Sequence, residues 1–392
     1  MSRPLRVMLV AVEASADSLG AGLAHALKAR LGDGVEFIGV GGAKMAAEGI
    51  ASPYDIGDLS LVGLFEIVGA VPLALRRLEE TVKLAEAAKP DIAVLIDSWE
   101  FTWRVGRRMR LRTPDVALIK YVAPQVWATR PGRARVVARI FDRLMTLFDF
   151  ETRYFEAEGA PTTSVGNPAL RRDLSGADPA RLRAAIEAGP DDPILLVLPG
   201  SRPGEIKRVM PAFEDAALRL ADAYPNLQIV VPAADTVAQQ VKARVAGWPR
   251  RARVVEGERD KLDAMRAATV ALACSGTVTT ELAVAGCPMV VGYRGHPATA
   301  LVARAIIRTR YFTLFNIAAD EAIAPEFLQE HCNGAELATA VAALLDDPAQ
   351  RAAQVKAQTA ALAKLGLNRS DPFEAAADVV IDLARSRGLL GG

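Results

Sequence analysis

The chain has 392 residues, of which 51% are hydrophobic and 24% charged, a composition typical of a soluble globular protein with two sizeable domains. Its 47 Lys and Arg residues against 46 Asp and Glu give a net charge of +1, which excludes a global positive field that would recruit nucleic acid. The three cysteines, Cys274, Cys287 and Cys332, are too scattered for a zinc cluster or a disulfide framework. We therefore expect reduced thiols, a cytosolic location and no bound metal.

Short apolar runs alternate with helical patterns along the first part of the chain, as expected for βαβ units of a parallel sheet. Strands are predicted at residues 5–12, 35–40, 91–96, 116–122 and 144–148. Residues 168–192 are polar and rich in proline, and they predict a linker. The alternation restarts with strands predicted at residues 194–198, 227–231, 253–255, 270–273 and 289–293, and helices follow from about residue 334.

These patterns predict an α/β protein with two Rossmann-like parallel-sheet domains facing across a cleft. The first domain is placed at residues 1–167, the second at residues 193–364 and a last helical segment at residues 365–392. The first residues lack the apolar core of an export signal, and no stretch reaches the length of a membrane span.

A phosphate-type loop follows the predicted strand at residues 270–273. Ser275, Gly276 and Thr277 begin the next helix, whose first amide groups have no partner inside the helix. Glu281 lies one turn further on the face of Thr277, where its carboxylate could accept hydrogen bonds from ribose hydroxyls. An ordinary capped helix explains this motif, taken alone, equally well.

A second loop of this kind follows the strand at residues 194–198. Ser201, Arg202 and Glu205 stand where the next helix begins, and a guanidinium at this sheet edge could bind a diphosphate through two parallel hydrogen bonds. A surface arginine near a helix start is the alternative, although a positive charge there opposes the helix dipole.

Polar residues also follow the predicted strands of the first domain. Glu13, Ser15 and Asp17 follow the first strand, Asp97 the third and Gln125 the fourth. Asp97 is the strongest candidate for a general base, since an acid at the end of a buried strand can accept a proton from a substrate hydroxyl. Asp97 could instead cap the following helix, and Glu13 or Asp17 could cap the first helix.

An ordered set of motifs resembles the lipid-A-disaccharide synthase family of two-Rossmann-domain (GT-B) glycosyltransferases, and the likeness covers nearly the whole chain. The motifs are residues 13–17, 39–42, 62–66, 121–128, 198–202, Glu205-Ile206, 275–277 with Glu281, 288–294 and Asn316. The sequence departs from the family pattern after Asp97, where Trp99 and Thr102 replace a proline and an asparagine.

The resemblance implies transfer of 2,3-diacylglucosamine from UDP to 2,3-diacylglucosamine 1-phosphate, with inversion, formation of a β-1,6 bond and release of UDP. It implies that Asp97 is the catalytic base, that no cofactor is needed and that a C-terminal helix returns to the first domain. The UDP pocket maps onto Ser201, Arg202, Glu205, Ser275, Gly276, Thr277 and Glu281. Contacts with the acceptor or donor sugar map onto Glu13, Ser15, Asp17, Gln125 and Asn316.

Both substrates of this family carry acyl chains, which suggests a peripheral protein on the anionic cytoplasmic face of the inner membrane. Leu61, Leu64, Phe65 and Val68 belong to the most apolar segment, residues 59–75, and are the candidates for membrane or acyl-chain contact. The basic stretch at residues 104–143 could meet anionic lipid or a phosphorylated substrate. A core or interdomain helix is the alternative for the first segment, and a solvated helix face for the second.

Two other functions remain open from the sequence. A UDP-sugar 2-epimerase shares the double-Rossmann architecture and a similar Ser-Gly-Thr loop, although no histidine falls at a strand end of the first domain here. A UDP-binding, membrane-associated protein without catalysis is the other alternative.

Overall fold

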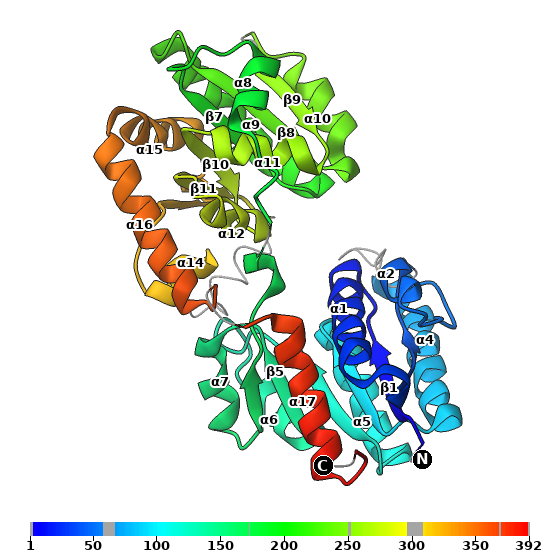
Figure 1. Cartoon of the computed structure of the whole chain (residues 1–392). Coiled ribbons are helices and arrows are strands. Elements are labelled where there is room, and N and C mark those ends of the chain that lie inside the picture. Colours follow the sequence, from blue (N-terminus) through cyan, green and yellow to red (C-terminus); the bar gives the residue numbers. More distant parts are fainter. Residues whose placement is uncertain are drawn as a thin grey trace. The chain divides into compact units, whose positions relative to one another are not determined.

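The computed structural model describes residues 3–57, 67–171, 173–249, 252–295, 309–367 and 370–390. Its contacts divide the chain into two compact units, Met1–Pro168 with Asn368–Gly392, and Ala169–Leu367 (Figure 1). Each unit is built on a parallel six-stranded sheet covered by helices. The prediction of an α/β protein with two Rossmann-like sheets is thereby confirmed.

The sheet of the first unit has the order β2-β1-β3-β4-β5-β6, and every neighbouring pair is parallel. Its elements are β1 (Leu5–Val10), α1 (Ala14–Leu31), β2 (Val35–Val40), α2 (Ala43–Ala47), α4 (Ile67–Ala88), β3 (Ile92–Ile96), α5 (Trp99–Arg112), β4 (Ala117–Tyr121), α6 (Arg133–Ile140), β5 (Arg143–Thr146), α7 (Asp149–Glu156), β6 (Thr162–Ser164) and α17 (Pro372–Ser386).

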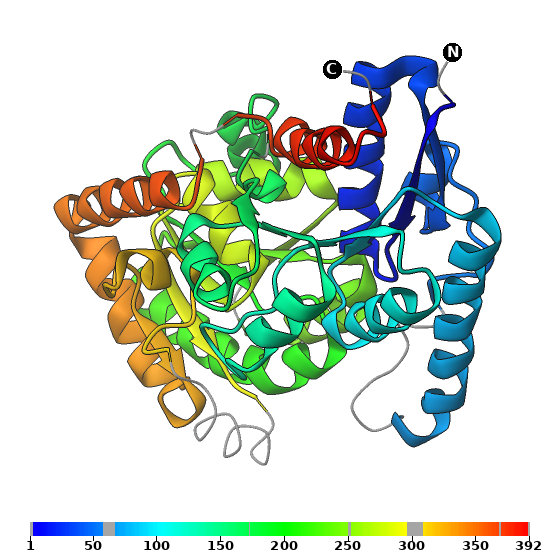
Figure 2. The ribbon, with the colours of Figure 1, turned by 90° about the horizontal axis from the view of Figure 1, so that it is seen from below.

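Two apolar layers enclose this sheet. Alternate residues of β1, β3 and β4 pack with α1 and α17 on one face, and the remaining residues pack with α4, α5 and α6 on the other. Figures 1 and 2 both show α17 beside α1, and Gly22 of α1 lets the ring of Phe373 pack closely against the α1 backbone. The last helix of the chain is thus part of the core of the first unit.

The sheet of the second unit has the order β9-β8-β7-β10-β11-β12, again entirely parallel. Its elements are α8 (Pro179–Ile186), β7 (Ile194–Leu198), α9 (Pro203–Ala223), β8 (Gln228–Ala233), α10 (Ala238–Val245), β9 (Ala252–Glu256), α11 (Glu258–Ala267), β10 (Val270–Cys274), α12 (Thr277–Val284), β11 (Met289–Tyr293), α14 (Leu314–Ala319), β12 (Glu326–Leu328), α15 (Gly334–Asp346) and α16 (Pro348–Lys364). Helices α9, α10 and α15 form one apolar cluster with the sheet.

An Asp-Pro pair begins three of the helices. Asp178, Asp347 and Asp371 accept hydrogen bonds from the first free amides of α8, α16 and α17, and a proline fills the first helical position of each. This pairing satisfies donors that a helix start leaves unpaired, and proline supplies the helical φ angle where its missing N–H costs nothing. These starts are therefore encoded locally.

The structure differs from the sequence predictions in two places. The edge strands β6 and β12 have three residues each and lack the apolar run that predicted the other strands. Residues 168–192, expected as a linker, contribute α8, which packs on α11; the guanidinium of Arg181 there pairs with the buried carboxylate of Asp263 at 2.6 Å. Part of the segment is thus an element of the second unit.

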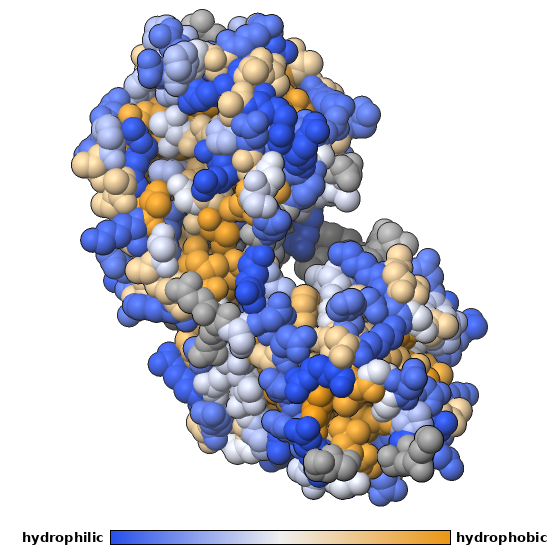
Figure 3. Space-filling model, viewed as in Figure 1, coloured by the Kyte–Doolittle hydropathy of each residue, from blue (hydrophilic) through white to orange (hydrophobic). Residues whose placement is uncertain are grey.

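The surface of each unit seen in Figure 3 is mostly hydrophilic, with hydrophobic side chains gathered in limited patches. Among the described residues, every helix is too short or too polar to cross a membrane.

Candidate functional site

A pocket of about 530 Å³ lies at the carboxyl ends of β7 and β10 in the second unit. Starting from β7, the chain builds the sheet outward through β8 and β9, and it then returns to place β10 on the other side of β7. Ligands of open α/β sheets bind at such a switch point. The lining includes all seven residues expected to bind the nucleotide: Ser201, Arg202, Glu205, Ser275, Gly276, Thr277 and Glu281.

The loop after β7 is shaped by Gly200 and Glu205. Gly200 has a φ of +115°, and a Cβ atom there would lie 2.5 Å from Glu205 Oε2. That oxygen accepts hydrogen bonds from the amides of Ser201 and Arg202 at 3.0 and 3.2 Å. Because Glu205 occupies these two amides, it organises the loop, and the guanidinium of Arg202 is the exposed group, with 82% of its side chain accessible.

The loop after β10 leaves its backbone open. Gly276 is extended, with a φ of 162°, and a Cβ atom added there would meet no atom within 4 Å. Within the described part of the chain, the amides of Gly276, Thr277 and Val278 have no hydrogen-bond acceptor, and all three residues line the pocket. Free amides at the first turn of a helix form an anion-binding site.

An ion pair crosses the same pocket. Lys261 Nζ of α11 donates to Glu281 Oε2 of α12 at 2.7 Å, and both side chains are mostly buried. The thiol of Cys274 also lines the pocket, where burial raises its pKa to about 12 and keeps it protonated. The pocket thus combines free amides, an exposed guanidinium and a carboxylate held by a lysine.

The first unit has its own switch point between β1 and β3. Asp97 directly follows β3 and Glu13 follows β1, so the parallel register brings both to the carboxyl edge of the sheet. Ser98 Oγ donates to Glu13 Oε1 at 2.7 Å. The N-cap of α5 is Ser98, so the alternative that Asp97 caps this helix is wrong. Among the described residues, no hydrogen bond to the Asp97 carboxylate is found, and the residue is half-buried.

A buried lysine lies beneath this edge. Lys120 in β4 is 0% exposed, and its Nζ donates to the carbonyls of Leu95, Asp97 and Tyr121. Burial lowers its pKa to about 7, an effect that the carboxylates of Asp97 and Glu13 oppose.

Two expected sugar-contact residues are engaged in hydrogen bonds within their own units. Asp17 is buried, and its carboxylate accepts from the amides of Gly42, Lys44 and Met45 at the start of α2. It therefore caps α2, and the idea that it caps the first helix is wrong. Asn316 is 0% exposed. Its side-chain NH2 group donates to the carbonyl of Ala324 and to the carboxylate of Glu326, and its side-chain oxygen accepts from the amide of Ala324. Ser15 and Gln125 are exposed.

Leu61, Leu64 and Phe65 lie outside the described residues, and so does the side chain of Val68 in α4. In the basic stretch, several arginines pair with nearby acids: Arg104 and Arg133 with Glu100, and Arg110 with Asp142. In these pairs the positive charge of the arginine is neutralised by an adjacent carboxylate.

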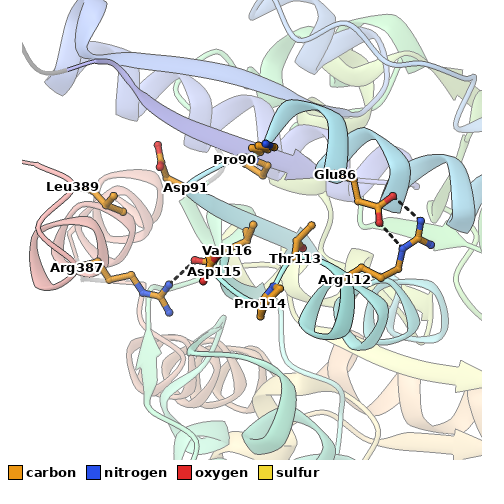
Figure 4. Close-up of a pocket in the computed structure, with 11 residues that line it drawn as sticks. Glu86, Pro90, Asp91, Arg112, Thr113, Pro114, Asp115, Val116, Arg387 and Leu389 are labelled. Carbon is orange, nitrogen blue, oxygen red and sulfur yellow. Dashed lines mark hydrogen bonds and ion pairs between the residues drawn. The ribbon is translucent and has the colours of Figure 1, made fainter.

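A second hollow, of about 890 Å³, lies at the opposite, amino edge of the first sheet (Figure 4). Its arginines are paired: Arg112 binds Glu86 through two hydrogen bonds of 2.6 Å, and Arg387 donates to the carbonyl of Asp115 at 3.0 Å. The hydrogen bond of Arg387 therefore joins the C-terminal segment to the rest of the first unit at this hollow.

Sequence reasoning missed Lys120 and Lys261. A lysine in the middle of an apolar run is a visible anomaly, and this signal could have identified Lys120. Lys261 lies in a charged amphipathic helix, where a lysine predicts only a solvated face. In the described residues, no group of three or more His, Cys, Asp or Glu side chains could hold a metal ion.

Solved structures with the same fold include the S. aureus MnaA protein determined with UDP, which has a TM-score of 0.62 and 17% identity and covers 98% of each chain. The UDP-GlcNAc 2-epimerase of Neisseria meningitidis bound to UDP-GlcNAc has a TM-score of 0.59 and 12% identity, and covers 97% of this chain and 100% of its own. The glycotransferase of kitacinnamycin has a TM-score of 0.59, 16% identity and coverage of 97% and 99%. These likenesses concern the fold alone.

Sequence relatives are closer. The lipid-A-disaccharide synthases of Rhodospirillum centenum and Nitrobacter hamburgensis are each 42% identical over 385 residues, covering 98% of this chain and 96% and 97% of theirs. The family model described as lipid-A-disaccharide synthetase matches residues 7–380. Because the family model covers residues 7–380 and these relatives are 42% identical over nearly the full length, the chain belongs to the lipid-A-disaccharide synthases and is a glycosyltransferase.

Proposed function

We propose that this protein transfers 2,3-diacylglucosamine from UDP to the 6-hydroxyl of 2,3-diacylglucosamine 1-phosphate. The products are the β-1,6-linked disaccharide phosphate and UDP. The observation that carries the proposal is the pocket at the β7/β10 switch point, whose free amides and exposed guanidinium suit a nucleoside diphosphate.

The second unit holds the nucleotide. The amides of Gly276, Thr277 and Val278 receive the diphosphate, because the equivalent amides after β7 are already occupied by Glu205. The guanidinium of Arg202 adds a charged fork to the same group. Glu281 accepts hydrogen bonds from the ribose hydroxyls, and Lys261 holds its carboxylate in place.

The first unit supplies the base. The Asp97 carboxylate accepts the proton of the acceptor 6-hydroxyl while that oxygen attacks C1 of the donor sugar. The C1–O bond to UDP breaks on the opposite face, which inverts the configuration at C1. The amides after β10 and Arg202 stabilise the negative charge that develops on the leaving diphosphate. Glu13, Ser15 and Gln125 stand at the same sheet edge and are available to the acceptor sugar.

The test is mass spectrometry of detergent-solubilised protein incubated with the two substrates. We expect a tetra-acylated disaccharide phosphate formed with an equimolar amount of UDP. Asp97→Asn should abolish the product and leave UDP affinity unchanged, since Asp97 and the UDP pocket belong to different units. Full activity of Asp97→Asn would remove it as the base.

The likeness in fold to 2-epimerases favours one other function, conversion of a UDP-sugar to its 2-epimer. Incubation with UDP-GlcNAc and analysis of the sugar products distinguishes the two. An epimerised UDP-sugar, with no disaccharide formed from the acylated substrates, would replace the transferase proposal.

We also propose that the protein works at the anionic cytoplasmic face of the inner membrane, because acylated substrates are presented at a bilayer surface. Leu64→Glu with Phe65→Glu should reduce sedimentation with anionic vesicles and leave UDP affinity unchanged. Phe312→Glu is a matched control, since this aromatic residue of the second unit is 37% exposed and lies outside both candidate segments. Equal sedimentation of all three proteins would contradict the proposal.

A further inference from the structure

Lys120 is an anomaly in the core of the first unit. It stands in β4, a central strand whose five residues are all buried, and its side chain is 0% exposed. Strands covered by helices on both faces ordinarily carry apolar side chains, and lysine is rarely buried without partners. A charged group in this position requires specific compensation.

The compensation comes from three backbone carbonyls. Lys120 Nζ donates to the carbonyl of Leu95 at 3.3 Å, to that of Tyr121 at 3.4 Å and to that of Asp97. Three acceptors match the three N–H groups of an ammonium. Since these carbonyls lie at the carboxyl ends of β3 and β4, the side chain brings its charge to the edge where Asp97 stands.

The backbone of Asp97 is held in an uncommon conformation there. Asp97 and Ser98 have φ values of +48° and +38°, a region that residues other than glycine rarely adopt. The Asp97 amide donates to the carbonyl of Tyr121 at 2.8 Å, and its carbonyl accepts from Lys120 and from Thr102 Oγ1, the latter at 2.7 Å. Such a turn persists only where the surrounding contacts determine it.

Two acidic groups face the ammonium. The carboxylates of Asp97 and Glu13 both raise the pKa of Lys120, although burial outweighs them. Glu13 is itself bound to Ser98, the second residue of the turn. Lys120 is thus connected to the turn both by its hydrogen bond to the Asp97 carbonyl and by its charge interaction with the Asp97 carboxylate.

We propose that Lys120 is a positioning residue for the transfer reaction, whose buried amino group, hydrogen-bonded to three carbonyls, fixes the Asp97–Ser98 turn and thereby aims the Asp97 carboxylate at the acceptor hydroxyl. The inference rests on the proposed role of Asp97 as the base. Lys120 itself does not touch the substrate, since its side chain has no exposed surface.

The test is the steady-state kinetics of Lys120→Met, which keeps most of the length and the apolar stem and removes the charge. A small misplacement of a reacting group costs about 100-fold in rate, so we expect kcat to fall by about 10- to 100-fold. The KM for the UDP-sugar and the affinity for UDP should stay within about twofold. Lys120→Arg, which restores the charge, should recover part of kcat.

Thr102→Val is the matched control, because it removes a neutral hydrogen bond to the same Asp97 carbonyl. It should lower kcat less than Lys120→Met does. If thermal unfolding shows that Lys120→Met does not fold, Lys120→Gln, with an amide donor and no charge, is measured against the same expectations.

The outcomes separate this inference from the proposed function. An inactive Asp97→Asn together with a wild-type kcat in Lys120→Met or Lys120→Gln would overturn the role of Lys120 alone. A parallel loss of kcat, UDP affinity and thermal stability would also overturn it, because that pattern marks a purely structural lysine. An active Asp97→Asn would instead remove the proposed base.

Discussion

Gly276→Ala gives a sharp test of the nucleotide pocket, because the structure separates its effect on folding from its effect on binding. Gly276 is extended, and the added methyl group would meet no protein atom within 4 Å. We therefore expect the free energy of unfolding to change by less than about 0.5 kcal/mol. Because Gly276, Thr277 and Val278 all line the pocket, we expect the added methyl group to occupy space that the diphosphate needs in front of their amides.

The expected loss in binding follows from those amides. A hydrogen bond to a charged group contributes about 1.5–3 kcal/mol, so displacing the diphosphate from one amide should weaken UDP affinity by about 10- to 100-fold. Isothermal titration calorimetry with UDP measures this loss, and thermal unfolding without ligand measures the stability.

Gly200→Ala is the matched control on the neighbouring loop. Its φ of +115° is unfavourable for alanine, and its Cβ would lie 2.5 Å from Glu205 Oε2. This variant should lose about 1–3 kcal/mol of stability. Wild-type UDP affinity in Gly276→Ala would refute the assignment of the diphosphate to the amides after β10. A large loss of stability in Gly276→Ala would refute the conclusion that the backbone at this position accommodates a methyl group.

Three further outcomes follow from single residues. Asp17→Ala leaves three amides of the α2 start without their acceptor and should destabilise the protein by about 2–4 kcal/mol in urea unfolding; an unchanged midpoint would refute the capping role. Arg202→Ala should weaken UDP binding by about tenfold in calorimetry, and unchanged affinity would remove its guanidinium from the diphosphate site. Burial raises the pKa of Glu151 to about 7, so the folded protein retains a proton that the unfolded chain releases near pH 4.5. Stability should therefore fall as pH rises from about 4.5 to 7, by up to about 1.4 kcal/mol per pH unit, and level off above 7. Glu151→Gln should lack this fall in thermal unfolding; equal slopes would contradict the burial effect.

Much of the fold could be predicted because its signals are local. Short apolar runs that alternate with helical patterns indicated ten of the strands and the two parallel sheets. The short edge strands β6 and β12 and the helix α8 were missed, since each is stabilised by its neighbours more than by its own pattern.

In the candidate sites, too, the features set by local sequence could be predicted and those set by distant contacts could not. The two loops at the β7/β10 switch point are each a strand, a turn and a helix start in continuous sequence. All seven residues that line the pocket from these loops could therefore be predicted from the sequence. What each side chain does there depends on distant partners. Glu205 turned out to be occupied by its own loop, and Glu281 is held by Lys261 from another helix.

The sequence by itself therefore determined the alternation of strands and helices, the order in which the loops occur and the family to which they belong. Only the tertiary structure decided that Asp17 caps α2, that Asn316 is buried among hydrogen bonds and that Lys120 reaches the turn of Asp97. The physical reason is that periodicity and turn chemistry act between residues a few positions apart. The partner of a buried polar group is chosen by the packing of elements that are remote in the chain.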